Sequence, residues 1–419
     1  MMLAVIALLG MAVVMVHSAG ASVGSNATLS LGSMLLSRHA IYAVMAVAAM
    51  MLAARVGVDR LEHLRGWRNP LWWLFALAVM LVALAMTPGL GRSVHGARRW
   101  LQVGPPAWQV SFQPSELVKW VTVILLAWWC SRRHADASCN DRDRPTGRTE
   151  EVSARSSVTA FGSRLNRAMD CPTLVVPLCV IAVASGVVLI EDLGTGVLIA
   201  AVSLFMLWAG GIRARHLAGP VLLGGAAIAA AIWTQPYRMA RLIAFVDPWA
   251  DPQGIGYHPI QSMLAIAEGG VGGRGLGGGI QKFGYLPEDT TDFLFAVICE
   301  ELGLAGALLV AVLLLALLWA ALRILRGRSE SFPRLLILGV MTTIALQSLL
   351  NIAVVTVVVP TKGIALPLLS AGGTGWVVTA FCIGLVASFD QTSDQYDEVE
   401  YRPIPEPTPP GFAGKRKIV

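Results

Sequence analysis

Residues 291–322 read TDFLFAVICEELGLAGALLVAVLLLALLWAAL, and this stretch decides the class of fold. Apart from one aspartate near its start and a pair of adjacent glutamates, it carries no charge. A helix needs about 20 predominantly apolar residues to cross the hydrocarbon core of a bilayer, so the stretch is long enough to span one. Because backbone polar groups cannot stay unpaired in hydrocarbon, such a span must be helical.

The rest of the chain has the same character. Its 419 residues are 55% hydrophobic and 14% charged, whereas a soluble domain has about 25% charged residues. This composition excludes a water-soluble globule. We therefore predict an all-α polytopic membrane protein with about ten transmembrane helices, in a membrane domain over residues 1–389. The apolar runs lie at roughly 1–18, 39–56, 71–87, 115–130, 173–190, 193–210, 217–234, 291–322, 335–359 and 374–389.

The distribution of lysine and arginine predicts the orientation. Of the 32 such residues, 22 fall on one side of the predicted spans, and the side richer in them is cytoplasmic. Both termini are then inside, and the loops at 88–114, 235–290 and 360–373 face outward, the second being the large loop between helices 7 and 8. One alternative is that residues 1–16 form a cleaved signal peptide, although they lack a basic start.

Charge and cysteine usage exclude several functions. The net charge of +6 follows from the positive-inside bias and does not indicate a nucleic-acid partner. The six cysteines show no metal-ligand spacing, so neither a zinc site nor a disulfide framework is expected. Two polar segments lie on the cytoplasmic side. Residues 131–172 form an insert that is a candidate for partner contacts, and residues 390–419 form a tail that we predict to be disordered.

Polar side chains against a bilayer are costly, and they are therefore candidates for function. A first group lies in and just after the outer loop at 88–114. Arg99 is in this loop, and Glu116 and Lys119 are at the start of the fourth span. Glu116 and Lys119 are three residues apart and share one helical face. The spacing fits a simple ion pair, and it fits equally a cationic cradle for a phosphate-bearing ligand.

The large outer loop supplies a second group, with Arg238, Gln261 and Lys282 as candidates for ligand contacts. Its residues 273–278 match the dinucleotide pattern G-x-G-x-x-G. The match follows no predicted strand and lies in a glycine run, so we reject it as a nucleotide site. We expect this glycine-rich segment to be a mobile loop that closes over a substrate.

Asp292, at the outer end of the eighth span, is the residue of most interest. A carboxylate there can accept a proton from a substrate hydroxyl. Position alone favours a helix N-cap, because aspartate is a preferred cap. Glu300 and Glu301 lie two turns deeper in the same apolar span and require a partner or a proton, since an unpaired buried carboxylate is costly. Lys119 is one candidate partner.

The third group follows the ninth span. Two prolines and several glycines around Ser370 predict a broken segment, which a membrane tolerates only where protein or water covers it. A serine nucleophile needs a base, and neither a nearby histidine nor a G-x-S-x-G pattern is present in this part of the sequence. We therefore expect Ser370 to be structural or to position a ligand.

Seven stretches, in order along the chain, resemble the SEDS family (shape, elongation, division and sporulation), the group of FtsW, RodA and SpoVE. They are GARRW at 96–100, QPSELVK at 113–119, EDLGTG at 191–196, DPWADPQGIGYHPIQS at 247–262, GLGGGIQK at 275–282, LPEDTTDFLFAVICEELG at 286–303 and GIALPLLSAGG at 363–373. The resemblance implies a ten-span membrane enzyme in the cytoplasmic membrane. Thr290, Ala371 and Glu191 depart from the family's usual residues, and the resemblance does not say whether they weaken activity.

The same resemblance implies an activity. It is that of an inverting peptidoglycan glycosyltransferase, which polymerises lipid II into β-1,4-linked glycan strands at the outer membrane face. The family's leading catalytic candidate corresponds to Asp292, and Arg99 and Lys119 match its other functional positions. The remaining substrate-binding candidates are Glu116, Arg238, Gln261, Lys282 and Ser370. No cofactor is demanded, and a divalent cation (Mg or Mn) is a candidate assistant.

The resemblance also implies partners, namely a class B penicillin-binding transpeptidase and proteins of the divisome or elongasome. It does not separate division, elongation and sporulation. Two other functions stay open. One is a transporter that flips lipid II between leaflets, which would require polar residues along the whole membrane path. The other is a non-catalytic scaffold that recruits the transpeptidase.

Overall fold

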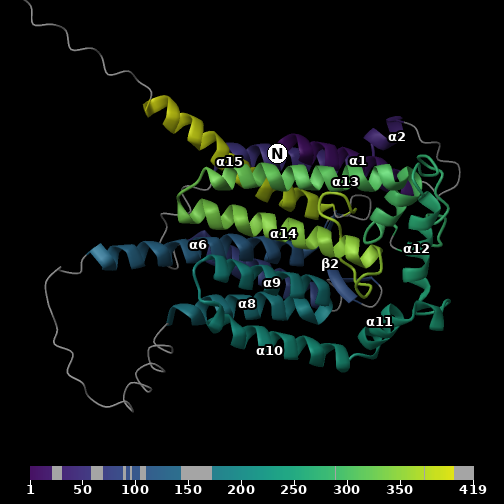
Figure 1. Cartoon of the computed structure of the whole chain (residues 1–419), viewed down its shortest axis with the longest axis horizontal. Helices are drawn as coiled ribbons and strands as arrows, with labels where there is room; N and C mark the ends of the chain where they lie inside the picture. Colours follow the sequence, from purple (N-terminus) through teal and green to yellow (C-terminus); the bar gives the residue numbers. More distant parts are fainter. Residues whose placement is uncertain are drawn as a thin grey trace, which may run out of the picture.

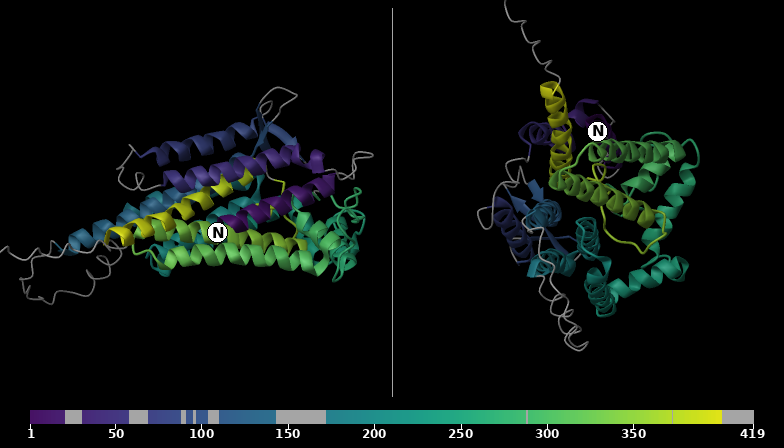
Figure 2. Two further views of the ribbon diagram at one scale, coloured as in Figure 1. Left: turned by 90° about the horizontal axis from the view of Figure 1, so that it is seen from above. Right: turned by 60° about the vertical axis from the view of Figure 1, so that its left-hand side comes forward.

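The computed structural model describes residues 1–20, 31–57, 69–87, 91–94, 97–103, 110–142, 172–287, 289–371 and 373–400. Long helices run side by side through the described part of the molecule (Figures 1 and 2). They are α1 (Met2–Gly20), α3 (Arg38–Val56), α5 (Pro70–Met86), α6 (Pro114–Arg142), α8 (Pro172–Glu191), α9 (Leu193–Ala209), α10 (Ala214–Trp233), α13 (Leu294–Arg326), α14 (Ser331–Val355) and α15 (Thr374–Glu400). Each overlaps one predicted span.

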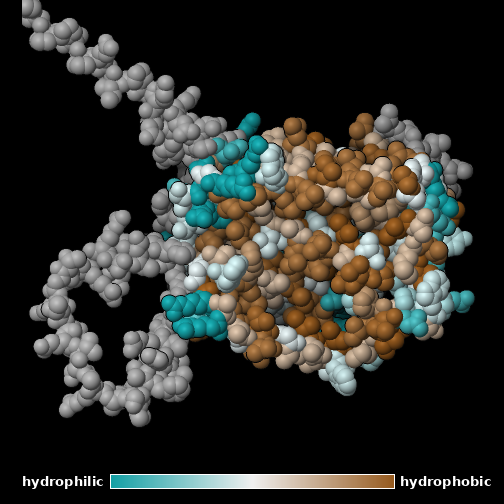
Figure 3. All heavy atoms as spheres, in the orientation of Figure 1, coloured by the Kyte–Doolittle hydropathy of each residue, from teal (hydrophilic) through white to brown (hydrophobic). Residues whose placement is uncertain are grey.

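The molecule is a multi-pass membrane protein. Among the described residues, six helices are long and apolar enough to cross a bilayer, namely α1, α3, α8, α10, α13 and α14. Shorter apolar helices occur at Pro70–Met86, Leu193–Ala209 and Thr374–Asp390. Figure 3 shows hydrophobic residues over the middle of one face and hydrophilic residues gathered toward its two ends. The predicted helical class is confirmed, whereas the count of ten membrane spans stays a prediction.

Two helices extend beyond their predicted spans. Helix α6 continues to Arg142, into the predicted insert, and α15 continues to Glu400, into the tail that we predicted to be disordered. Residues 391–400 continue α15 in the structure, and the expected disorder of the tail stays a prediction. Residues 143–171 and 401–419, which make up the rest of the insert and the tail, lie outside the described residues.

Local sequence explains where several helices begin. The Asn69 side chain accepts a hydrogen bond from the Leu71 amide, and Pro70 occupies the first turn of α5. The Asp192 side chain caps α9 by accepting from the Thr195 amide. Both aspartate and asparagine are preferred caps, and proline is well suited to the first helical position. The Asn69 cap fixes the end of α5 away from strand β1, whereas the Asp192 cap fixes the end of α9 beside Arg99.

One end of the bundle, which we call the loop end, holds the shorter elements (Figure 1). A three-stranded antiparallel sheet, in the order β1 (Gly91–Val94), β2 (Ala97–Val103) and β3 (Val110–Phe112), was not predicted from the sequence. Helices α11 (Pro236–Val246) and α12 (Tyr257–Gly269) and the 3-10 turn η3 (Pro248–Ala250) come from the large outer loop. A five-residue helix, α2 (Leu31–Leu35), precedes α3.

Helix α13 is broken at Gly303, whose φ of 64° and ψ of −157° are non-helical. The amides of Arg274 and Gly275 donate to the carbonyls of Glu300 and Glu301, so the glycine-rich segment fills the break. A Cβ on Gly303 would lie 2.4 Å from the Gly273 nitrogen, which only glycine avoids. We expected these glycines to form a mobile loop over a substrate, but in the structure they pack against α13.

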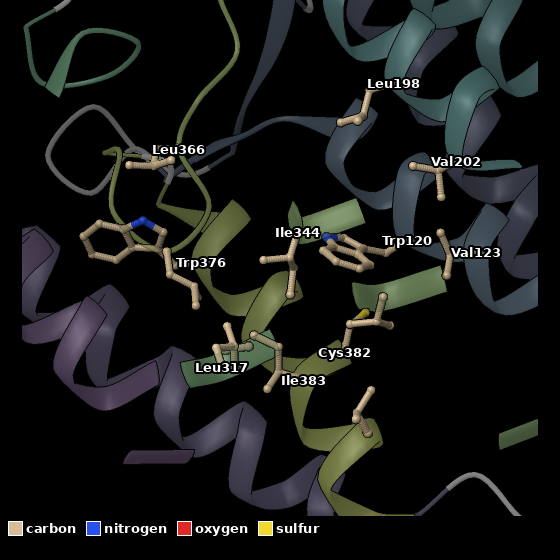
Figure 4. Packing of buried hydrophobic residues seen from close by; sticks show 14 of the residues in the cluster. Trp120, Val123, Leu198, Val202, Leu317, Ile344, Leu366, Trp376, Cys382 and Ile383 are labelled. Atoms are coloured by element: carbon tan, nitrogen blue, oxygen red, sulfur yellow. The ribbon is translucent and has the colours of Figure 1, made fainter. Parts of the chain in front are cut away.

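The apolar core lies where α6, α9, α13, α14 and α15 meet. Figure 4 shows its packing, with Trp120 from α6, Ile344 from α14 and Trp376 from α15 among the labelled side chains. Trp120 and Trp376 are among the largest fully buried residues. Helix α10, all of whose residues are described, has Leu217 as its one buried residue and lies at the edge of the bundle. The core thus lies beside the loop end, and α10 lies outside the core with its exposed side chains facing lipid.

Candidate active site

Asp292 lies at the loop end, directly before α13. The helix begins at Leu294, its N-cap position is Phe293, and no side-chain cap bond forms there. The N-cap interpretation of Asp292 is therefore wrong, because the helix starts one residue too late for it. The Asp292 side chain is half-buried. Its backbone carbonyl accepts a 2.8 Å hydrogen bond from the side-chain amide of Asn351 on α14.

Asp292 and Arg99 meet at Gly363. A Cβ built on Gly363 would lie 2.7 Å from Asp292 Oδ2 and 3.7 Å from Arg99 Nη1. Both charged groups therefore pack against Gly363, although one comes from the segment before α13 and the other from strand β2. A carboxylate and a guanidinium are thus brought together at the loop end. This juxtaposition is what catalysis of proton transfer next to an anionic leaving group requires.

The EDLGTG stretch holds Arg99 in place. Its Nε donates to the Glu191 carbonyl at 3.0 Å, and its Nη1 lies 3.8 Å from Asp192 Oδ2. The Glu191 carboxylate accepts from the neighbouring Arg98 amide at 2.9 Å. The Arg99 side chain is 34% exposed, so it can still reach a ligand. Glu191, a departure from the family pattern, therefore serves to anchor β2.

Further cations surround Arg99. On α11, Arg238 donates to the carbonyls of Leu189 and Ile190 at the end of α8, and Arg241 donates to the Thr361 carbonyl at 3.2 Å. Lys362 follows Thr361 directly. Burial, with repulsion from Arg238 and Arg241, lowers the pKa of Lys362, and attraction to Asp192 offsets part of that shift. The loop end therefore concentrates positive charge around two short segments, 189–192 and 361–363.

Lys119 and Glu116 form an ion pair at 2.7 Å, which confirms the ion-pair interpretation of their spacing. The Lys119 side chain is 2% exposed, and its ammonium also donates to Gln347 Oε1 at 2.8 Å. Gln347 in turn donates to the Ala365 carbonyl. Lys119 therefore supports the 363–371 segment from beneath, and a direct contact between Lys119 and a phosphate stays a prediction.

Lys282 lies in a second buried cluster, apart from the contacts around Gly363. Its ammonium pairs with Glu301 at 2.7 Å and lies 3.3 Å from the Ser18 hydroxyl of α1. Lys119 is therefore not the partner of Glu300 or Glu301, because Glu116 occupies it. Glu300 accepts from the amides of Ile280 and Gln281 instead. A ligand-binding role for Lys282 stays a prediction.

Ser370 and Gln261 occupy different settings. The Ser370 hydroxyl accepts from the Leu366 amide at 2.8 Å, and its carbonyl accepts from the Trp376 indole, so the residue holds the broken segment as expected of a structural serine. Gln261 is half-buried on α12. On the same helix His258 stacks on Phe293, the neighbour of Asp292, with ring centroids 5.9 Å apart. A ligand contact of Gln261 stays a prediction.

Sequence reasoning missed the role of Gly363, of Asp192 and of Arg241. The D-x-x-T spacing of Asp192 and Thr195 is a recognisable helix-cap signal, and it places the end of α9. Nothing in the sequence indicates that Gly363 touches Asp292.

For metals, no group of three or more histidine, cysteine or acidic residues close enough to hold an ion occurs in the described part of the chain. A divalent cation stays a prediction.

Comparison with known proteins agrees with this fold. The model of the FtsW/RodA/SpoVE family, described as cell cycle protein, matches residues 1–395, and the chain belongs to that family. The probable peptidoglycan glycosyltransferase FtsW of Nitrosococcus halophilus is 35% identical over 391 residues, which cover 92% of this chain and 90% of the relative. The protein of the same name from Thioalkalivibrio sulfidiphilus is 36% identical over 390 residues, covering 92% and 87%.

Solved structures share the architecture. A chain from a peptidoglycan synthase complex, described as coordinating polymerization and crosslinking, superposes with a TM-score of 0.67 at 22% identity, covering 94% of this chain and 97% of that one. The rod shape determining protein RodA of Thermus thermophilus superposes with a TM-score of 0.57 at 21% identity, covering 93% and 95%. At these identities the likeness shows the fold.

Proposed function

We propose that this protein is a peptidoglycan glycosyltransferase that polymerises lipid II into β-1,4-linked glycan at the outer face of the cytoplasmic membrane. The observation that carries the proposal is the meeting of Asp292 and Arg99 at Gly363. Membership in the FtsW/RodA/SpoVE family and the names of its relatives support it. The orientation that follows from the lysine and arginine distribution puts both termini in the cytoplasm and the loop end outside.

Asp292 is the proposed general base. It takes the proton from the 4-hydroxyl of the acceptor's GlcNAc as that oxygen attacks C1 of the donor's MurNAc. The bond between C1 and the phosphate oxygen breaks, undecaprenyl pyrophosphate leaves, and the α linkage becomes β. A hydroxyl is a poor nucleophile, and a positioned base contributes about 10²–10⁴-fold to such a step. The Asp292 side chain is only half-buried, as the approach of a sugar hydroxyl would require.

Arg99 is the proposed stabiliser of the departing diphosphate. A guanidinium offers a planar pair of donors that matches phosphate oxygens. Arg238, Arg241 and Lys362 add positive charge close by, and such preorganised charge lowers the free energy of the transition state without reorganisation. The isoprenoid tail of the substrate would lie along lipid-facing helices such as α10, where Leu222 and Leu223 are exposed.

The proposed partner is a class B penicillin-binding transpeptidase, together with divisome or elongasome proteins. The structural relative from a peptidoglycan synthase complex, described as coordinating polymerization and crosslinking, supports the transpeptidase partner. The flippase alternative is weaker, because the exposed candidate residues gather at the loop end. The buried polar pairs deeper in the bundle, Lys119–Glu116 and Lys282–Glu301, have each other as partners.

The experiment that tests the proposal is reconstitution of the purified chain with a class B penicillin-binding protein in liposomes containing lipid II. We expect glycan strands of many disaccharide units on a gel. Parallel samples with Mg, with Mn and with a chelator show whether a divalent cation assists. A leaflet-resolved assay on the same liposomes measures flipping. Movement of lipid II between leaflets without any glycan strand would contradict the enzyme and support the transporter.

A further inference from the structure

Asn351, on α14 directly beneath the site, joins the two segments that meet there. Its side chain is fully buried, and its Nδ2 donates to the carbonyl of Asp292 at 2.8 Å and to that of Ile364 at 2.7 Å. Ile364 follows Gly363, whose Cα touches the Asp292 carboxylate. One amide therefore ties the residue that carries the carboxylate to the backbone that the carboxylate packs against.

The chemistry of this contact requires an asparagine or a close equivalent. An NH2 group has two donors, and both are used on carbonyl oxygens, which fixes the orientation of the amide. Aspartate would have no donor to offer, and an aliphatic side chain would leave both buried carbonyls without this bond. Asn351 Oδ1 is itself buried and accepts no hydrogen bond among the described residues. A buried acceptor left without a partner is costly, so the position of the amide is set by its two donor bonds.

A second tie strengthens the same junction. The Ala371 amide donates to the Thr290 carbonyl at 2.9 Å, two residues before Asp292. The Asp292 segment is thus attached to the 363–371 segment on both sides of the carboxylate. Of these two ties, the Asn351 bond alone comes from a side chain, so it can be removed by substitution without changing the backbone.

We propose that Asn351 is a positioning residue, which holds the Asp292 carboxylate beside Arg99 by fixing the Asp292 carbonyl against Ile364. The inference rests on the proposed function, because it assigns the positioning to the base of that reaction. A displacement of about 1 Å at a reacting group can lower a rate about 10²-fold. Asn351 does not need to contact the substrate, because its substitution would lower the rate of the chemical step through the displacement of Asp292.

The test compares Asn351→Ala with a matched control on α12, the Ser262 side chain, which bonds to the same helix α14. Ser262→Ala removes a buried hydrogen bond of 2.7 Å to the Val355 carbonyl of α14, one turn beyond Asn351. Both variants thus lose buried hydrogen bonds to or from α14, but only one loses a contact with Asp292. In the lipid II assay we expect Asn351→Ala to lower kcat about 10²-fold with KM changed less than about twofold. Ser262→Ala should keep the parental kcat.

A conservative variant and a measurement without turnover complete the test. Asn351→Gln keeps both donors one carbon further out, so it should recover part of the rate even if the alanine variant folds poorly. Hydrogen exchange at the Ala371 amide should be faster in Asn351→Ala than in the parent and unchanged in Ser262→Ala. Equal kcat and equal exchange in the Asn351 and Ser262 variants would overturn the positioning role. A parent that makes no glycan would instead contradict the proposed function, and the exchange result would still decide the positioning.

Discussion

Asp292 and the pair Glu300 and Glu301 lie within three helical turns of each other around the start of α13. They differ in burial and in the groups that contact their carboxylates. Glu300 and Glu301 are 0% exposed. The amide of Gly277 donates to Glu301, and the amides of Ile280 and Gln281 donate to Glu300. Glu301 also pairs with Lys282 and accepts from Ser18. Asp292 is half-buried and lies against Gly363 and Arg99 at the end of the bundle.

The difference separates structural carboxylates from a reactive one. A buried carboxylate with its lone pairs occupied by amides and a lysine cannot reach a substrate, and its partners hold two segments of chain together. A half-buried carboxylate beside a partly exposed arginine can accept a proton from a ligand that approaches from outside. Sequence position singled out Asp292 at the outer end of the span, and it indicated for Glu300 and Glu301 only that they need a partner or a proton.

The largest expected effect on stability comes from Lys282. Lys282→Met leaves the buried Glu301 carboxylate without its cation, and breaking a buried ion pair typically costs about 3–5 kcal/mol. We expect the thermal midpoint of the purified protein in detergent to fall steeply. Arg274→Met is the control, because Arg274 pairs with Glu268 at the surface with both side chains about one third exposed, and such pairs contribute about 0–1 kcal/mol. Equal midpoints for the two variants would refute the structural assignment.

Gly363→Ala tests the other side of the comparison. Its Cβ would lie 2.7 Å from Asp292 Oδ2, so the carboxylate must move. The atom that moves is the end of a side chain, and we therefore expect little loss of stability but a fall in the polymerisation rate of about 10²-fold. Gly186→Ala on α8, where a Cβ meets nothing within 4 Å, is the control. A Gly363→Ala enzyme as fast as the control would show that Asp292 does not work from this position.

Ser18→Ala sharpens the structural side and tests whether α1 belongs to the folded bundle. The Ser18 hydroxyl donates to both oxygens of Glu301, so its loss should lower the free energy of unfolding by about 1 kcal/mol. Thermal melts of the purified parent and variant measure the difference. A parental melting curve, together with a mass that lacks the first helix, would support the cleaved signal peptide instead.

The smallest expected effect is a pH dependence from Lys362. Its pKa in the folded protein is lowered, mainly by burial, so the unfolded chain binds the proton more tightly. Stability therefore rises as the pH increases from the lowered pKa toward the ordinary value of about 10.4. Lys362→Met should lose this rise. Thermal midpoints of both proteins over that alkaline range measure it, and parallel pH curves would contradict the lowered pKa.

The sequence was sufficient for the membrane class and for the approximate positions of the long helices, because apolar length acts locally. It did not give the ends of α6 and α15, which continue past their predicted spans. It was not sufficient for the sheet β1–β2–β3, whose short strands leave no strong pattern. Nor could it pair Lys282 with Glu301, since that contact depends on how the glycine-rich segment enters the break at Gly303.

The candidate site shows the same division. Asp292 and Arg99 could be selected as polar residues on the outer side, and their motifs resemble those of a known family. That they meet at Gly363 depends on the tertiary fold, in which a broken segment after α14 passes between β2 and the start of α13. A side chain at position 363 would separate them, but a single glycine in a sequence with 42 of them gives no such signal.

The most direct test of the central claim is the rate of lipid II polymerisation by Asp292→Asn in complex with the transpeptidase, measured beside the binding of lipid II to the same variant. Asparagine keeps the size of the side chain and removes its ability to take a proton. We predict parental binding and a rate lower by about 10²–10⁴-fold. A variant that binds lipid II and polymerises it at the parental rate would contradict the assignment of Asp292 as the base.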